Sequence, residues 1–315
     1  MDYYENELTQ SVEEPKRMSD KKILCYCGFF MAVTTIVVLA VQSVVLLVVN
    51  GFFPDMAEEG WFNVALTVIS VLGSGLPIFL VLMKRIPKSE IGEKSRLSIG
   101  QFLGYFIVCA GAAYITNIIG MYISSFIEII KGFKLENPLE TFIFNSDMIL
   151  VIIYASIIAP IVEELIFRKI LLDKLRRFGD LPAILITGFA FGLFHLNLSQ
   201  FFYATVLGMI FAYITIRTNR IIYAILLHMM LNFVGTGIVP YIVVNESILG
   251  TILVTIWSFG SMTIASLLII LKGRKIVLNK PNKPLVNRWY YIFNPGALLF
   301  VIICIGIIVF QVIYS

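Results

Sequence analysis

The feature that most constrains this chain is a series of apolar segments, each about as long as a lipid bilayer is thick. Roughly 20 apolar residues cross the hydrocarbon core of a bilayer as a helix. Hydropathy separates nine such segments, at residues 23–50, 61–83, 101–127, 148–171, 182–197, 200–216, 221–239, 248–271 and 296–313. Because 59% of the 315 residues are hydrophobic and only 14% are charged, a soluble globular protein is excluded. The sequence predicts an all-α, polytopic bundle of transmembrane helices.

The distribution of lysine and arginine predicts how this bundle is oriented. Both residues gather before the first apolar segment and after the second, fourth, sixth and eighth, whereas the alternate loops are poor in them. By the positive-inside rule the N-terminus is therefore cytoplasmic. We expect eight or nine spans, because the ninth segment opens with Asn294-Pro295-Gly296 and only about 18 apolar residues follow. This is a multi-pass membrane protein, in the cytoplasmic membrane if its source is bacterial.

Two adjacent carboxylates and an arginine stand within the fourth apolar segment. A charged side chain near mid-bilayer costs about 2.5–3.5 kcal/mol on insertion scales, so such residues usually face a bundle interior and mark a functional site. Glu164 and Arg168 are four residues apart and share a helix face, which predicts an ion pair. Glu163 lies about 100° around the helix, so it stays free for chemistry. Pro160 removes a backbone donor just upstream and is expected to kink or loosen the helix.

Two further polar pairs lie in the fifth and seventh apolar segments. Phe191 precedes His195 by four residues and His228 precedes Asn232 by four, so each pair shares one helix face. These are the two histidines of the whole chain. A lone histidine in a span is often a packing residue, and the carboxylate set alone could be a buried ion pair that fixes helix packing. Three polar sets on three helices favour an active or binding site.

These side chains suit hydrolysis by an activated water molecule. A carboxylate in a low-dielectric pocket binds a proton more readily than in water and can act as a general base beside a histidine. A second histidine and an asparagine amide can donate to the oxyanion that forms when water adds to a carbonyl. The motifs contain no serine or cysteine, so a covalent nucleophile is not indicated. Zinc held by Glu163, His195 and His228 stays an alternative, although the H-E-x-x-H pairing of common zinc proteases is missing.

The three motifs together resemble those of a known family. Glu163–Arg168 reads EELIFR, Phe191–His195 reads FGLFH and His228–Asn232 reads HMMLN. In this order, on three polar-bearing spans, they closely resemble the motifs of the CPBP intramembrane proteases over roughly residues 145–240. That family contains the type II CAAX prenyl endopeptidases and the bacteriocin-processing and self-immunity (Abi) proteins. Its core resembles eight spans, so a ninth span here would be a departure.

The resemblance implies an activity and a role for each of these residues. It implies an intramembrane endopeptidase in which Glu163 activates water with the help of His195. His228 and Asn232 are then the pair that stabilises the oxyanion or holds the water molecule. The supporting residues implied are Glu164, Arg168 and Phe191. Both a metal-dependent and a metal-free, glutamate-dependent mechanism are compatible with the family.

We divide the chain into four predicted parts. These are a cytoplasmic tail at 1–22, N-terminal transmembrane helices at 23–140, a CPBP-like catalytic core at 141–240, and C-terminal transmembrane helices at 241–315 that include a basic cytoplasmic linker at 273–290. The four cysteines lie in apolar runs and are expected to be packing residues, not a disulfide framework or zinc ligands.

The predicted function is hydrolysis of a peptide bond in a membrane-associated protein or peptide. The alternative is a non-proteolytic membrane scaffold, or a bacteriocin-immunity protein, that binds a membrane partner. A proton-coupled transporter is disfavoured, because the inverted repeats of such proteins are not found in the sequence. The expected partners are the lipid bilayer and the substrate, and the net charge of +4, carried by the loops, gives no reason to expect nucleic acid. Zinc is the one cofactor considered.

One expectation about depth decides whether the site assembles. From the predicted segment ends, Glu163 lies about eight residues from the cytoplasmic end of its span, and His195 lies about 13 residues into its own. At about 1.5 Å per residue, His195 is then some 7 Å deeper in the membrane. The two side chains meet if the short fifth and sixth segments tilt, or if the fifth helix begins below the membrane plane.

Overall fold

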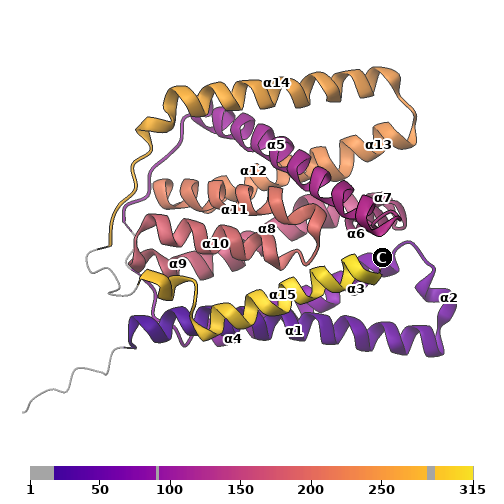
Figure 1. The fold of residues 1–315 in the computed structure, drawn as a ribbon, viewed down its shortest axis with the longest axis horizontal. Coiled ribbons are helices and arrows are strands. Elements are labelled where there is room, and N and C mark those ends of the chain that lie inside the picture. The colour runs from indigo at the N-terminus through magenta and orange to yellow at the C-terminus, as the bar shows by residue number, and fades with distance from the viewer. Residues whose placement is uncertain (1–17, 90–91, 282–287, 315) are drawn as a thin grey trace, which may run out of the picture.

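Helices account for all the regular structure in the computed structural model, which describes residues 18–89, 92–281 and 288–314 (Figure 1). Eight helical stretches in these residues are long and apolar enough to cross a membrane. They are Asp20–Phe52, Phe62–Met83, Ile99–Lys131, Met148–Phe178, Leu198–Thr218, Ile222–Val244, Ile248–Lys272 and Pro295–Tyr314. The prediction of an all-α polytopic bundle is confirmed, and the chain is a multi-pass membrane protein.

The ninth predicted segment is confirmed as a span-length helix, and the fifth is too short to count among the eight spans. The ninth segment is a full helix of 20 residues, Pro295–Tyr314, whereas the fifth is a helix of only 15 residues, Asp180–Phe194. Residues 1–17 of the predicted tail and 282–287 of the predicted linker lie outside the described residues. The division into four parts and the cytoplasmic N-terminus stay predictions.

Several of the long stretches change helix type along their length. In chain order the elements are α1 (Asp20–Phe52), α2 (Pro54–Ala57), α3 (Phe62–Val68), η1 (Ile69–Gly75), α4 (Leu76–Met83), α5 (Ile99–Lys131), α6 (Pro138–Phe144), α7 (Met148–Ile153), η2 (Tyr154–Ile158), α8 (Ala159–Glu164), η3 (Leu165–Leu171), α9 (Leu172–Leu175), η4 (Arg176–Phe178), α10 (Asp180–Phe194), α11 (Leu198–Thr218), α12 (Ile222–Asn232), η5 (Phe233–Ile238), α13 (Val239–Val244), α14 (Ile248–Lys272), η6 (Gly273–Lys275), η7 (Arg288–Tyr291) and α15 (Pro295–Tyr314). Of these, η1, η2, η3 and η5 are π-helical.

Three of the π-helical segments are explained by proline. Pro77, Pro160 and Pro240 each stand two residues after the end of η1, η2 and η5 respectively. Proline has no N–H and its ring collides with the carbonyl four residues earlier, so the preceding turn widens. In each case the residue just before the proline donates its N–H five residues back instead of four. The prediction that Pro160 loosens its helix is confirmed. No proline follows η3, and π-helical turns of that kind are frequent at functional sites.

Small residues let the helices around the polar motifs approach closely. A Cβ added to Gly188 would lie 2.3 Å from Met209 Cγ, and one added to Gly192 would lie 1.9 Å from Thr205 Oγ1. This G-x-x-x-G pattern on α10 presses its backbone against α11, as small residues do in membrane helix pairs. The contact brings the backbone of Gly208 on α11 to the centre of the bundle.

Two outer helix pairs enclose this central layer, as Figure 1 shows. On one side α15 crosses α1, where a Cβ on Gly28 or Gly296 would collide with the facing backbone. On the other side α14 packs against α5, with Gly111 touching the backbone of Ser261. The ninth apolar segment therefore packs against the first, and α8, α10, α11 and α12 lie between the two outer pairs.

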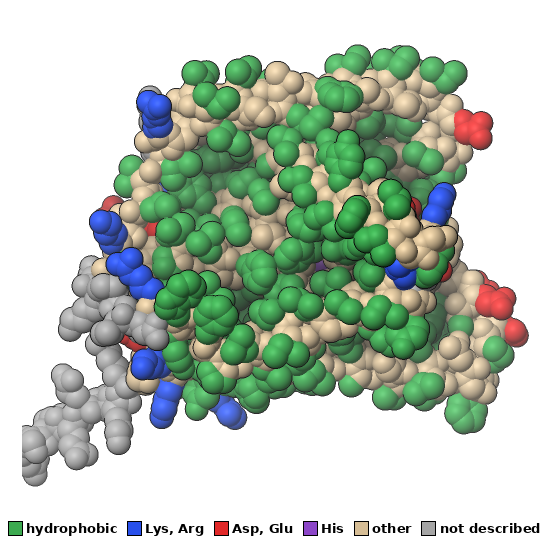
Figure 2. Space-filling view, viewed as in Figure 1, with side chains coloured by type: hydrophobic (Ala, Val, Ile, Leu, Met, Phe, Trp, Pro, Cys, Tyr) green, Lys and Arg blue, Asp and Glu red, His purple; other side chains and the backbone are tan. Residues whose placement is uncertain are grey.

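The surface divides by charge at its two ends. Figure 2 shows most of the visible Lys and Arg side chains at the end where α1 begins, whereas the opposite end carries prominent Asp and Glu side chains beside a few basic ones. A broad hydrophobic surface lies between them. This is the distribution from which the positive-inside rule assigns a cytoplasmic end, and it supports the predicted orientation.

Candidate active site

The second carboxylate of the motif is fully paired. Glu164 Oε2 lies 3.1 Å from Arg168 Nε, and neither side chain is exposed. Arg168 Nη2 also donates to the Gly208 carbonyl on α11, at 3.1 Å. This is the ion pair that the i,i+4 spacing predicts. The contact with Gly208 was not predicted, because it depends on the close approach of α10 and α11.

Aromatic rings surround the buried guanidinium. The Arg168 Cζ atom lies 4.4 Å from the ring centre of Phe191, 5.4 Å from that of Phe211 and 5.8 Å from that of Phe167. Cation–π attraction is strongest where water is excluded, and here it offsets part of the cost of burying the charge. Phe191 lies where a supporting residue of the site is expected, and Phe211 is an addition from α11.

His228 lies between the two carboxylates. Its Nδ1 is 3.0 Å from Glu164 Oε1, and its Nε2 is 3.8 Å from Glu163 Oε2. A carboxylate paired with an arginine only accepts hydrogen bonds, so Nδ1 carries the proton and Nε2 faces Glu163. The bond between Glu164 and His228 was not predicted, because it joins residues 64 positions apart in the chain. Glu164 therefore supports the site by fixing the ring of His228 as well as by pairing with Arg168.

His195 reaches the same cluster from the C-terminal end of α10. Its Nδ1 donates to the Phe191 carbonyl at 2.8 Å, which leaves Nε2 free. The Phe191 ring contacts both histidines, with ring centres 4.9 Å from His195 and 5.7 Å from His228. The Glu163 carboxylate also acts electrostatically on the His195 ring.

The expected difference in depth between Glu163 and His195 does not arise. The fourth stretch continues to Phe178 instead of ending at residue 171, and α10 begins at Asp180 after a turn at Gly179 with φ +93°. Glu163 and His195 consequently stand 16 residues before and 16 residues after Gly179. They lie at comparable distances from the same turn, so the predicted offset in depth is absent.

Glu163 differs from its neighbour in having a single, more distant partner, His228. Its side chain is 21% exposed, and its Oε2 atom accepts no hydrogen bond from the described residues. The hydroxyls of Tyr154 and Tyr203 lie within electrostatic range of the carboxylate. The helix-face argument predicted this division between a paired and a free carboxylate. The two tyrosines, Tyr154 on η2 and Tyr203 on α11, were not predicted.

Asn232 is held by the backbone of η2. Its Nδ2 donates to the Ala155 carbonyl at 2.8 Å. Thr236, one turn further along, donates to the Asn232 carbonyl and lies 3.2 Å from the Ser156 hydroxyl. The i,i+4 spacing of Asn232 and Thr236 could have identified Thr236 as a polar residue on the same face. Together these bonds fasten α12 and η5 to η2.

The geometry does not bring Glu163, His195 and His228 together as a zinc site. No three His, Cys, Asp or Glu side chains in the described parts of the chain are grouped so that they could hold a metal ion. The Nδ1 atoms of both histidines are engaged in other bonds, so each ring has Nε2 left to meet a ligand. Zinc dependence therefore stays a prediction of the sequence.

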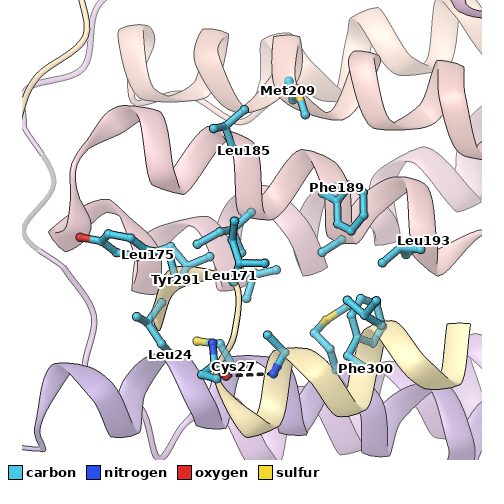
Figure 3. A pocket seen from close by; sticks show the side chains of 18 residues that line it. Leu24, Cys27, Leu171, Leu175, Leu185, Phe189, Leu193, Met209, Tyr291 and Phe300 are labelled. Carbon is cyan, nitrogen blue, oxygen red and sulfur yellow. Dashed lines mark hydrogen bonds between the residues drawn. The ribbon is translucent and has the colours of Figure 1, made fainter. Parts of the chain in front are cut away.

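An apolar cavity of about 340 Å³ lies apart from this cluster (Figure 3). It is lined by α1, α15, η3, α9, η7, α11 and the opposite face of α10. The labelled lining residues are Leu24, Cys27, Leu171, Leu175, Leu185, Phe189, Leu193, Met209, Tyr291 and Phe300. Its described lining contains no charged side chain and none of the candidate catalytic residues. The cavity is a feature of the packing between the outer pair α1–α15 and α10.

Comparisons with known proteins agree with the motif pattern. The family described as "Type II CAAX prenyl endopeptidase Rce1-like" matches residues 145–234, which include all three motifs. The "Putative membrane peptidase YdiL" of Bacillus subtilis (strain 168) is 31% identical over 170 residues, which are 53% of this chain and 68% of that protein. No solved structure matches the chain.

Proposed function

The chain belongs to the CPBP family of intramembrane proteases, and we propose on this basis that it uses Glu163 to hydrolyse a peptide bond with water. The substrate proposed is a protein or peptide associated with the membrane. The activity takes place within the bundle, where the polar side chains of α8, α10 and α12 meet.

One observation carries the proposal. Of the two adjacent carboxylates, Glu164 is fully buried and bound by both Arg168 and His228, whereas Glu163 is 21% exposed and has only His228 Nε2 near it, at 3.8 Å. A general base needs an unoccupied lone pair and access to water. A cluster that served packing alone would have no use for a second carboxylate left without a close partner at a cost in a low-dielectric environment.

The proposed reaction proceeds by general base catalysis. The Glu163 carboxylate takes a proton from a water molecule, whose oxygen adds to the peptide carbonyl carbon. The Nε2 atoms of His195 and His228 are the free ring nitrogens that can orient this water molecule. The C–N bond then breaks as the Glu163 carboxylic acid passes its proton to the leaving amine nitrogen.

The oxyanion formed in this reaction needs hydrogen-bond donors. Two groups are proposed for this role: the second N–H of the Asn232 carboxamide, whose first N–H binds Ala155, and Nε2–H of His228 when that ring is protonated. Arg168 does not serve directly, since it is fully buried behind Glu164 and Phe191.

Cleavage by the purified protein tests the proposal. The protein in liposomes is given quenched fluorescent peptides taken from membrane-protein segments, with and without a chelator. We expect Glu163→Ala and His228→Ala to lose cleavage, and Glu58→Ala, an exposed carboxylate on another loop, to keep it. Loss of cleavage with chelator and rescue by zinc would establish the metal-dependent alternative. Full activity of Glu163→Ala would refute the proposal, and biological function retained without cleavage would indicate a binding protein.

A further inference from the structure

The environment of Ala155 explains how Asn232 is held. In a helix the Ala155 carbonyl would accept from the N–H of residue 159 in an α-turn or of residue 160 in a π-turn. Ala159 donates instead to the carbonyl of Tyr154. Residue 160 is a proline and has no N–H. The carbonyl of Ala155 therefore has no donor of either kind within its own helix.

The Asn232 side chain supplies the missing donor. An unpaired carbonyl is costly in a membrane, and Nδ2 of Asn232 binds this one at 2.8 Å. Because a carbonyl only accepts, the amide must present its nitrogen to Ala155, and its Oδ1 must point elsewhere. No described residue donates to that Oδ1. The carboxamide is thus fixed in one of its two orientations.

A second bond keeps the two helices in register. The single proton of the Thr236 hydroxyl goes to the Asn232 carbonyl, so Ser156 must be the donor in the contact between Ser156 and Thr236. Ser156 is the neighbour of Ala155 and Thr236 is one turn beyond Asn232. Both bonds join η2 to the same face of α12 and η5, which limits sliding of one helix along the other.

We propose that Pro160 is a positioning residue for the proteolytic site, acting through the carbonyl of Ala155 on the orientation of Asn232. This inference rests on the proposed function, since it assigns Pro160 a part in the same reaction. If Pro160 served only to bend the helix, that role would not require a bond from the Asn232 side chain. The bond from Asn232 to the one carbonyl that Pro160 leaves unpaired links the two residues physically.

Replacement of Pro160 by alanine distinguishes a positioning role of Pro160 from a role in helix bending alone. The new N–H at position 160 competes for the Ala155 carbonyl and releases the carboxamide. We expect Pro160→Ala to lower kcat by about 10–100-fold, the range in which misplacement of a catalytic group falls, with KM changed less than about twofold. Because alanine suits a helix interior better than proline, we expect Tm to stay the same or to rise.

The matched control is Pro77→Ala, since Pro77 follows η1 as Pro160 follows η2 but is exposed and stands on a different membrane-spanning stretch. We expect it to leave kcat unchanged. A double-mutant comparison is decisive: if Pro160 acts through Asn232, Pro160→Ala has no further effect on kcat in the Asn232→Ala protein. Multiplicative effects, or an unchanged kcat in Pro160→Ala, would overturn the inference.

Two further variants, Asn232→Asp and Glu163→Ala, complete the test. If Pro160→Ala does not accumulate, Asn232→Asp keeps the shape of the side chain and removes the N–H that Ala155 accepts. We expect this variant to lose as much kcat as Asn232→Ala, and wild-type activity in it would contradict the inference. Glu163→Ala is assayed in parallel: its activity would refute the proposed function, whereas its inactivity beside a fully active Pro160→Ala would refute the role of Pro160 alone.

Discussion

The two faces of α10 show how differently one helix can be used. One face carries Phe191 and His195, which contact Arg168, His228 and the carboxylate cluster. The opposite face carries Leu185, Phe189 and Leu193, which line an apolar cavity of about 340 Å³. The first face is closely packed and hydrogen-bonded, whereas the second leaves unfilled space and has no charged neighbour among its described residues. Changes on the first face should therefore alter chemistry, and changes on the second should alter packing alone.

The side chains on the closely packed face offset the free energy cost of burying charge within a membrane protein. Glu164, Arg168 and His228 are almost completely buried, and an isolated ion there would be strongly unfavourable. Each is bound by another member of the cluster, and Arg168 is also enclosed by aromatic rings. Glu163 is the least buried side chain of the cluster, at 21% exposure, and His228 Nε2, its charged neighbour, is 3.8 Å away. Under the proposed function it is the side chain that reacts with water.

The largest effect is expected at that side chain. Glu163→Gln preserves the size of the group and removes the base, so we expect cleavage to fall by about 10²–10⁴-fold. Stability should change by less than about 1 kcal/mol, because Glu163 is part-exposed and its free oxygen has no bond to lose. The two quantities are measured by peptide cleavage and thermal unfolding of the same preparation. A Glu163→Gln variant that is active, or inactive only because it unfolds, would contradict the assignment of Glu163 as the base and Glu164 as the paired carboxylate.

The next largest effect is expected for the buried ion pair. Arg168→Met leaves Glu164 without its cation, and breaking a buried pair in this way costs about 3–5 kcal/mol of unfolding free energy. Lys169→Met is the matched control, because Lys169 is 53% exposed and its contact with Asp173 is 3.6 Å long. Exposed pairs contribute about 0–1 kcal/mol. Equal destabilisation by the two variants, measured by steric trapping in bicelles, would show that Arg168 is not held as a buried ion.

Much of the polar face was predictable because its signals are local. The pairing of Glu164 with Arg168 and the separate orientation of Glu163 follow from helix geometry over a few residues. The bond from Glu164 to His228 and the exposed fraction of Glu163 depend on how distant helices pack. No single-helix pattern contains that information.

The end of the fourth stretch shows why boundaries were harder to predict. The charges at residues 173–177 suggested that the helix stops at residue 171, yet it continues to Phe178. Lys174 is buried because its ammonium group donates to the Ile86 carbonyl, and Asp173 is buried beside Lys169. The loop that follows α4 thus binds the buried ammonium group of Lys174. The sequence does not show which loop will lie against which helix end.

A moderate effect is expected where α10 meets α11, between the two faces. A Cβ at Gly192 would lie 1.9 Å from Thr205 Oγ1, so Gly192→Ala must push α10 away from α11. Overpacking of this kind costs about 1–3 kcal/mol. We also expect lower kcat, because His195 is less than one turn away. Gly104→Ala on α5 is the control, since it meets open space and should be neutral or stabilising. Unchanged stability and kcat in Gly192→Ala would show that α10 is not fixed by this contact.

The smallest effect is expected on the cavity face. Leu185→Phe adds volume where the lining leaves room, and filling a cavity typically adds about 0.5–2 kcal/mol of stability. Because the polar cluster lies on the other side of α10, we expect kcat and KM to stay within about twofold of the wild type. Phe191→Leu, on the same helix but facing Arg168 and both histidines, should lower both stability and kcat. If Leu185→Phe reduced cleavage as strongly as Phe191→Leu, the cavity would be coupled to the reaction, and the two faces of α10 would form one functional unit.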